Sequence, residues 1–177
     1  ATQMLDGGNR DTYGVFAQGD IVLLPKLRLN AGLRYDRYSD YDPTLNPRVA
    51  LLCDPWVGTT FKAIYGTAFR APSFLEENLA FTKPLVPETI TTYELIWEQR
   101  LNDHLRSSVA GFFNHMDDLI TFDRNLDSAE AKGVELGLEG RWAGGWRGRV
   151  SYTLQAVEDL ATGEPLPDAP NHLVKAN

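Results

Sequence analysis

The stretch Leu27-Arg28-Leu29-Asn30-Ala31-Gly32-Leu33-Arg34-Tyr35-Asp36 decides the fold, because its apolar and polar residues alternate. Successive side chains of a β-strand point to opposite faces, so every second residue shares a face. One face here carries Leu, Ala and Tyr side chains, and the other carries Arg, Asn and Asp side chains. A helical period would mix these two sets. The stretch therefore predicts a strand with one apolar and one polar face.

The same alternation recurs along the chain. Two further segments, residues 12–24 and 105–116, alternate less cleanly but are rich in residues that favour strands. We therefore predict eight strands, with a ninth beginning at Leu173. The clearest apolar rows are Phe61, Ala63 and Tyr65; Tyr93, Leu95 and Trp97; Val134, Leu136, Leu138 and Trp142; and Trp146, Val150, Tyr152 and Leu154.

The connections between these segments alternate between tight and long. Tight turns are expected at residues 25–26, 54–56, 101–103 and 143–145, and longer polar loops at 37–46, 70–87, 117–130 and 158–171. Transmembrane barrels have short turns at one end and long external loops at the other. A soluble β-sandwich has no reason to collect its long loops at one end, so the pattern favours a barrel.

Composition narrows the class of protein. The chain has 177 residues, of which 43% are hydrophobic, and a net charge of −7, so no basic surface indicates nucleic-acid binding. No run approaches the roughly 18 apolar residues of a membrane helix. A barrel strand needs only about 10 residues of alternating character. The single cysteine, Cys53, excludes an internal disulfide and a cysteine-based zinc site.

The polar face indicates a wide barrel. Charges in a narrow interior would have to be densely paired, whereas a hydrated lumen tolerates them. We therefore expect an all-β fold, an antiparallel transmembrane β-barrel segment in which about eight strands form an arc of a larger barrel. Because the chain stops at Asn177 soon after a strand begins, we expect a fragment of a longer protein. The residues expected to face inward are Arg28, Arg34, Asp36, Lys62, Glu94, Glu98, Glu135, Glu139, Arg141, Arg147 and Arg149.

Aromatic residues support a membrane location. Barrels place aromatic girdles at both membrane interfaces. Tyr35, Tyr38 and Tyr41 lie towards a long loop. All four tryptophans lie in or near tight turns, and we expect them to form a girdle at that end: Trp56, Trp97, Trp142 and Trp146.

Five segments, in order, carry a resemblance to a known family. They are NPRVAL (46–51), GTAFRAPSFLEE (66–77), PLVPETITTYEL (84–95), AKGVE (131–135) and DAPNH (168–172). In this order and spacing the chain resembles the barrel domain of TonB-dependent outer-membrane receptors from about Tyr13 onward. It departs from the family pattern at Ile96, where a glycine is usual.

The resemblance implies a function. The family has a 22-stranded barrel whose lumen is filled by an N-terminal plug domain, and residues 1–177 would be part of that barrel, with the plug lying outside them. A ferric siderophore, haem or cobalamin would bind the external loops and plug, and TonB would then pull on the plug. The expected location is the outer membrane of a Gram-negative bacterium, in contact with its lipid. No enzyme activity, cofactor or metal site is expected.

The long loop after residue 70 holds the candidate ligand contacts, because binding residues concentrate on loops held by a rigid scaffold. Two other interpretations remain open for the loop: Arg70 and Glu77 could pair with each other, or they could fix the loop to the barrel wall. Asp40, Asp42, Asp117 and Asp118 could hold calcium, although solvated loop acids are the simpler interpretation. The candidates for ligand contact are Arg70, Glu76, Glu77, Asn78 and Lys83.

Three other classes of protein compete with a receptor. A passive porin-like or small structural barrel would lack TonB coupling. An outer-membrane enzyme would need a site where catalytic side chains converge. His104, His115 and His172 are instead spread along the chain, and Ser73 lacks a nucleophile-elbow context. A soluble sandwich would have to cover the outward rows of apolar side chains.

Overall fold

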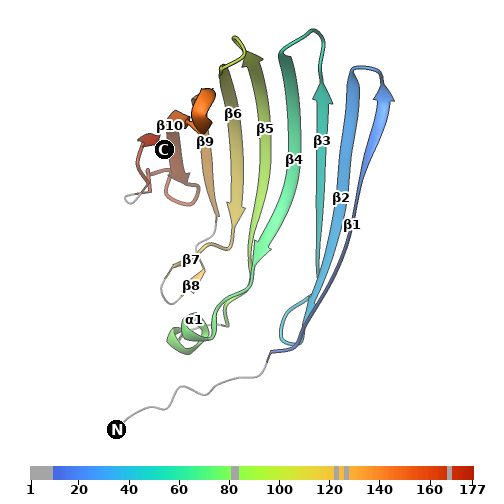
Figure 1. Ribbon diagram of the computed structural model, residues 1–177. Coiled ribbons are helices and arrows are strands. Elements are labelled where there is room, and N and C mark those ends of the chain that lie inside the picture. Colours follow the sequence, from blue (N-terminus) through green and yellow to red (C-terminus); the bar gives the residue numbers. More distant parts are fainter. Residues whose placement is uncertain (1–9, 81–83, 122–123, 126–127, 167–168) are drawn as a thin grey trace.

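The computed structural model contains one curved antiparallel sheet (Figure 1). It describes residues 10–80, 84–121, 124–125, 128–166 and 169–177. The strand order in the sheet is β1-β2-β3-β4-β5-β6-β9-β10-β11, so neighbours in sequence are neighbours in space. The long strands are β1 (Thr12–Leu24), β2 (Leu27–Tyr38), β3 (Thr44–Cys53), β4 (Thr59–Arg70), β5 (Glu88–Arg100), β6 (Leu105–Asp117), β9 (Ser128–Arg141) and β10 (Arg147–Asp159).

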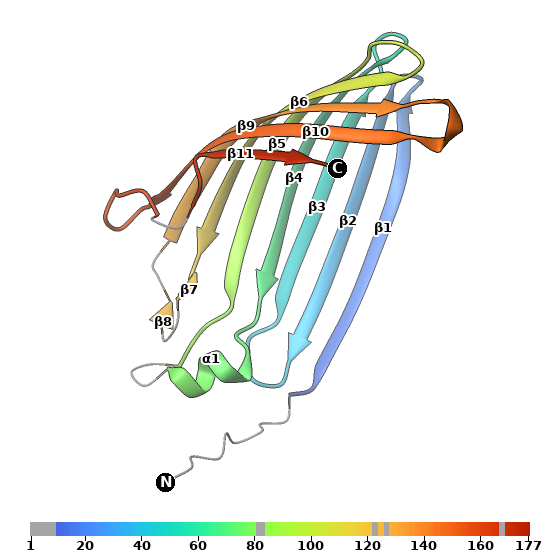
Figure 2. The same ribbon diagram turned by 60° about the vertical axis from the view of Figure 1, so that its left-hand side comes forward.

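The eight predicted strands are confirmed, and the ninth is β11 (His172–Ala176). The long strands have 10 to 14 residues. That length crosses a bilayer when the strand is tilted. The sheet is open, with β1 and β11 at its two edges, and it curves like part of a barrel wall (Figure 2). Sequence patterning did not predict the two-residue strands β7 (Ile120–Thr121) and β8 (Arg124–Asn125), which pair within one long loop.

The register places the predicted apolar residues on one face of the sheet. Leu95 lies between Ala63 and Gly111, and the same row continues to Leu51 on one side and Val134 on the other. These side chains are not covered by a second layer, since Leu95 is 69% exposed and Val134 is 44% exposed. Among the described residues the buried hydrophobic core contains only Leu85, Ala129 and Ala131. A β-sandwich would bury such rows between two sheets, so the fold does not agree with one.

The connections collect at two ends, as predicted. Tight turns join β1 to β2, β3 to β4 and β5 to β6 at one end (top of Figure 1), and α1, β7 and β8 lie at the other. The loop predicted at residues 37–46 is shorter than expected, because β2 extends to Tyr38 and leaves only residues 39–43. It is no longer than the turn at residues 54–58, so the length of a connection does not show to which end of the sheet it belongs. The two ends are distinguished by where the connections lie in the sheet.

The tryptophans lie at the tight-turn end. Trp56 packs edge-on against Phe61 at 6.4 Å between ring centroids, and Phe61 stacks on Trp97, also at 6.4 Å. Trp142 and Trp146 flank the short helix η1 (Ala143–Gly145) between β9 and β10. This placement is the one expected of an interfacial girdle.

No helix among the described residues is long and apolar enough to span a membrane.

Candidate functional site

Helix α1 (Phe74–Leu79) organises the long loop between β4 and β5 (Figure 1). Ser73 is its N-cap: the Ser73 hydroxyl accepts a hydrogen bond from the Glu76 amide, and the Glu76 carboxylate accepts one from the Ser73 amide at 2.7 Å. This reciprocal capping box satisfies two backbone donors that a helix start leaves free. Pro72 ends the preceding extended segment and is almost fully buried. The sequence APSFLEE therefore encodes a short helix held at the mouth of the sheet.

Arg70 fixes this helix to the wall. Its guanidinium group donates to Glu88 at 2.6 and 2.8 Å and to Glu76 at 3.1 Å. Glu88 also accepts from the Ile120 amide at 2.6 Å, so it connects this loop to the loop between β6 and β9 at the same end of the sheet. Hydrogen bonding from Arg70, helped by the Ser73 amide, lowers the pKa of Glu76 to about 2. Glu76 is therefore a carboxylate at every physiological pH.

Arg10, which precedes β1, holds three segments together. Its guanidinium group forms ion pairs with Asp40 and Glu77, both at 2.7 Å, and donates to the Pro72 carbonyl at 2.8 Å. The same group lies 5.0 Å from the ring centre of Tyr41 and 4.9 Å from that of Phe74. The Arg10 side chain is only 12% exposed.

Tyr41 completes this cluster by donating its hydroxyl hydrogen to Glu77. Burial, then the Glu77 carboxylate, raises the pKa of Tyr41 above its ordinary value. The lead into β1, the β2–β3 loop and the β4–β5 loop are therefore joined into one unit.

The structure brings four of the five candidate ligand contacts into this loop and gives each an internal partner. Arg70 pairs with Glu76 and Glu88, so the predicted Arg70–Glu77 pair is wrong and the predicted fixing of the loop to the wall is confirmed. The Asn78 amide donates to the Phe74 carbonyl at 2.7 Å. Lys83 lies outside the described residues. Whether these residues also contact a ligand stays a prediction.

A hollow of about 440 Å³ opens on the polar face near the loop end of β1 to β4. Sequence analysis placed Arg34 on this face but did not single out the hollow. Arg34 is paired with the buried Asp36 at 2.7 Å, whereas Arg48 has no ion-pair partner among the described residues. Hence the hollow offers a solvated cation beside aromatic rings. We call it the loop-end hollow; its lining includes Phe16, Gln18, Arg34, Tyr38, Asn46 and Arg48.

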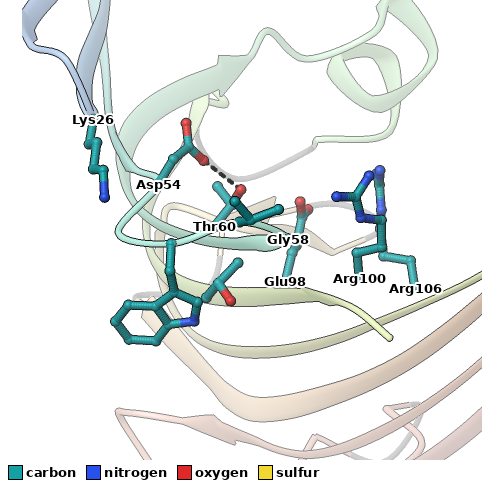
Figure 3. Close-up of a pocket in the computed structure, with 10 residues that line it drawn as sticks. Lys26, Asp54, Gly58, Thr60, Glu98, Arg100 and Arg106 are labelled. Carbon is teal, nitrogen blue, oxygen red and sulfur yellow. Dashed lines mark hydrogen bonds between the residues drawn. The ribbon is translucent and has the colours of Figure 1, made fainter. Parts of the chain in front are cut away.

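A second hollow, of about 530 Å³, lies at the tight-turn end. Figure 3 shows Asp54, Glu98 and Arg106 on the inner side of the curved sheet, as predicted for Glu98. The Thr60 hydroxyl donates to Asp54 at 2.6 Å, and this bond lowers the pKa of Asp54 below its ordinary value. Lys62 pairs with Glu98 at 2.6 Å. The tight-turn end of the inner face is thus densely charged, and Asp54, Lys62 and Glu98 are paired there.

No group of side chains suited to metal binding occurs in the described part of the chain. His104, His115 and His172 lie on different elements, and no group of three metal-ligating side chains converges. The carboxylate of Asp40, one of the acids considered for calcium, is bonded to Arg10. The fold, the charged inner face and the organised mouth are features of a barrel wall.

Comparison with known proteins decides the family. The family model described as "TonB dependent receptor-like, beta-barrel" matches residues 2–177. The chain belongs to this family. No curated protein sequence matches the chain.

Solved structures agree with this TonB-dependent receptor fold. A mutant of the ferric enterobactin receptor PfeA from Pseudomonas aeruginosa, in complex with enterobactin, superposes with a TM-score of 0.76 at 19% identity, over 94% of this chain and 30% of that one. The copper transporter OprC gives 0.75 at 20% identity, over 94% and 32%. FauA, the alcaligin outer-membrane receptor of Bordetella pertussis, gives 0.71 at 22% identity, over 94% and 33%.

These similarities show the fold alone, because the identities are low. The chain spans about a third of the length of each of these solved structures. They confirm the predicted antiparallel barrel segment, and the match to the family model confirms the predicted family.

Proposed function

We propose that the chain is part of an outer-membrane receptor that takes up a ferric siderophore, or a similar nutrient such as haem or cobalamin, in a TonB-driven cycle. The observation that carries the proposal is the loop-end hollow. It combines a solvated cation at Arg48 with the rings of Phe16 and Tyr38, beneath a mouth that Arg10 and Arg70 hold in place. Ferric chelates are bulky and often anionic, so such a surface suits them.

The solved structures similar to this chain support this substrate class. Two of the three structures described above are named as receptors for siderophores, enterobactin and alcaligin. The third, named as a copper transporter, favours a metal-related nutrient more broadly.

The proposal assigns roles to parts beyond residues 1–177. A plug domain elsewhere in the parent chain would fill the lumen against the charged inner face. TonB would act on that plug, and the outward apolar rows would contact outer-membrane lipid of a Gram-negative bacterium. The loop residues Arg70, Glu76, Glu77, Asn78 and Lys83 would meet the ligand at the mouth. No covalent chemistry is part of this cycle.

The test is uptake of radioactive iron by a Gram-negative strain that lacks its own siderophore receptors and carries the complete receptor gene containing this segment. We expect uptake of at least one ferric siderophore that stops when TonB is deleted. Arg48→Ala should weaken binding, whereas Arg37→Ala, on the same sheet with an exposed side chain, should not. Uptake that persists without TonB would refute the proposed coupling.

A passive porin-like barrel is the alternative function. It predicts flux of many small solutes in reconstituted vesicles, proportional to concentration and indifferent to TonB. The organised loop mouth does not favour an open pore. Solute-swelling rates of vesicles that hold the complete protein would distinguish the two.

A further inference from the structure

Two hairpins at the tight-turn end place arginines directly opposite each other. Arg100 lies opposite Arg106 where β5 meets β6. Arg141 lies opposite Arg147 where β9 meets β10. Like charges in opposed positions destabilise a strand pair, so an anion bound between them would relieve the repulsion. The register puts one further arginine on the same inner face, and we call the group the basic lip: Arg100, Arg106, Arg141, Arg147 and Arg149.

The two acids of the tight-turn hollow are already bonded to other groups. Glu98 forms an ion pair with Lys62 at 2.6 Å, and Asp54 forms one with Arg28 at 3.3 Å. Both arginines of the β5–β6 hairpin line the same hollow, and neither has an ion pair among the described residues. Their side chains lie next to each other at the edge of the hollow (Figure 3). The hollow therefore offers two guanidinium groups to an anion from outside the sheet.

The β9–β10 side of the lip also keeps an excess of positive charge. Glu139 lies opposite Arg149 in register, and its carboxylate is 2.7 Å from Arg141. Arg149 is 58% exposed and lies 3.7 Å from Glu135, so this contact is loose. Arg147 has no ion pair in the part of the chain that the structure describes. The lip is thus cationic although the whole chain has a net charge of −7.

Backbone hydrogen bonds hold the lip in place. The Arg100 amide donates to the Gly58 carbonyl at 2.7 Å, and the Arg100 carbonyl accepts from the Gln99 side chain at 3.1 Å. The Arg141 amide donates to the His104 carbonyl at 2.8 Å, so the two hairpins are joined. Because this backbone is already ordered, binding an anion there costs less conformational entropy.

The spacing of the arginines suits a peptide better than a single phosphate. Opposed residues of a sheet lie about 4.5–5.5 Å apart, and diagonal neighbours about 7–8 Å apart. Arg106 and Arg141 are such diagonal neighbours, because Arg106 lies opposite Glu139. Side chains on one face of an extended peptide are about 6.6–6.8 Å apart. Two carboxylates on alternate residues can therefore each meet one arginine pair, whose guanidinium groups donate two hydrogen bonds at a time.

We infer that the basic lip binds an acidic peptide segment of a periplasmic partner protein, with carboxylates on alternate residues. The inference rests on the membrane orientation of the proposed function, which puts the tight-turn end in the periplasm, but not on ligand uptake. Val57, in the turn between β3 and β4, is 86% exposed and lines the same hollow, so it offers an apolar contact to the segment.

The test is fluorescence anisotropy of two labelled hexapeptides with the complete receptor in detergent at low salt. One peptide alternates aspartate with serine, and the other has the same composition with its aspartates in one block. We expect the alternating peptide to bind more tightly, and its binding to weaken as salt screens the charges. The double variant Arg100→Gln with Arg106→Gln should weaken this binding about tenfold, because two exposed ion pairs are lost. Arg37→Gln is the matched control, because Arg37 is exposed and lies near the loop end of β2.

The second arginine pair and the competing ligands have their own measurements. Arg147→Gln should remove the preference for the alternating peptide, and Arg106→Gln alone carries the test if the double variant does not fold. Equal affinity of the double variant and the wild type would overturn the inference, as would failure of the complete receptor to bind either peptide. Displacement of the peptide by inorganic phosphate at constant ionic strength would assign the lip to a small anion instead, and displacement by phosphatidylglycerol to a lipid headgroup. Because peptide binding is measured without iron or TonB, such a failure leaves the uptake proposal to its own test.

Discussion

Replacing Arg10 should release the mouth of the barrel segment while leaving the sheet intact. The Arg10 side chain contacts the β2–β3 loop through Asp40 and Tyr41 and the β4–β5 loop through Pro72 and Glu77. Every strand-to-strand hydrogen bond is independent of it. The variant Arg10→Met keeps an apolar stem but removes the charge and all donors.

The contacts of Arg10 determine how much stability the loop should lose. Breaking a buried ion pair costs about 3–5 kcal/mol, because the partner charge is left without compensation. The partners Asp40 and Glu77 are 36% and 29% exposed, so water compensates them in part. We therefore expect a loss of about 2–4 kcal/mol in the local stability of the loop. This corresponds to a roughly 30- to 700-fold fall in the protection of loop amides.

Hydrogen exchange measures this loss. The amides of Glu77 and Ala80, which bond to the carbonyls of Ser73 and Glu76, should exchange faster in Arg10→Met, whereas amides in the middle of β5 should not change. Arg37→Met is the control, since Arg37 is exposed and has no ion pair among the described residues. Unchanged protection at Glu77 and Ala80 would refute the role given to Arg10.

Four further predictions test other parts of the structure. Ser73→Ala removes the N-cap of α1 and should cost about 1 kcal/mol of local stability, seen as faster exchange at the Glu77 amide, with Ser73→Asp as the variant that restores protection. The stability that the Glu76 carboxylate contributes is fully present above its unfolded pKa of 4.5. This stability should disappear as the pH falls towards the folded pKa of about 2. A side-chain NMR titration should therefore show no protonation of Glu76 at pH 4. Because its pKa is raised, Tyr41 should stay protonated above pH 10, and the stability that it contributes should be lost only as the pH rises further. The tyrosinate absorbance of the protein, compared with that of Tyr41→Phe, measures this deprotonation. Trp97→Ala removes the stacking of Trp97 on Phe61 and should lower the free energy of unfolding, measured in detergent, by about 1 kcal/mol. Trp146→Ala should have less effect, because the Trp146 side chain is 75% exposed.

The sheet could be predicted because strand patterning is local. Alternation such as that of residues 27–36 involves only adjacent residues, and most long strands were predicted from it; β1 and β6 were predicted mainly from their content of strand-favouring residues. The short hairpin β7–β8 carries no such pattern, since its strands have only two residues each. Its position depends on contacts with other loops, such as the bonds of about 3.0 Å between the Asn125 side chain and the Val86 backbone.

The candidate site was predicted less completely, because its contacts join residues far apart in sequence. Arg70 and Glu76 are close in the chain, so their loop could be found from the motif. Arg10 is 67 residues from Glu77, and no local pattern links them. The choice of Glu76 over Glu77 as partner of Arg70 depends on the helical turn that Ser73 caps, which places successive residues on different sides of α1.

The central claim is that one face of this sheet meets lipid and the other meets the receptor lumen. Spin labels placed one at a time at Leu95, Leu136, Glu94 and Glu135, in a Cys53→Ser background of the complete receptor in lipid vesicles, test it most directly. We predict that labels at Leu95 and Leu136 are relaxed by dissolved oxygen, and that labels at Glu94 and Glu135 are relaxed only by a water-soluble agent or are shielded from both. Equal access of the water-soluble agent to all four positions would contradict the account, because the apolar face would then lie in water.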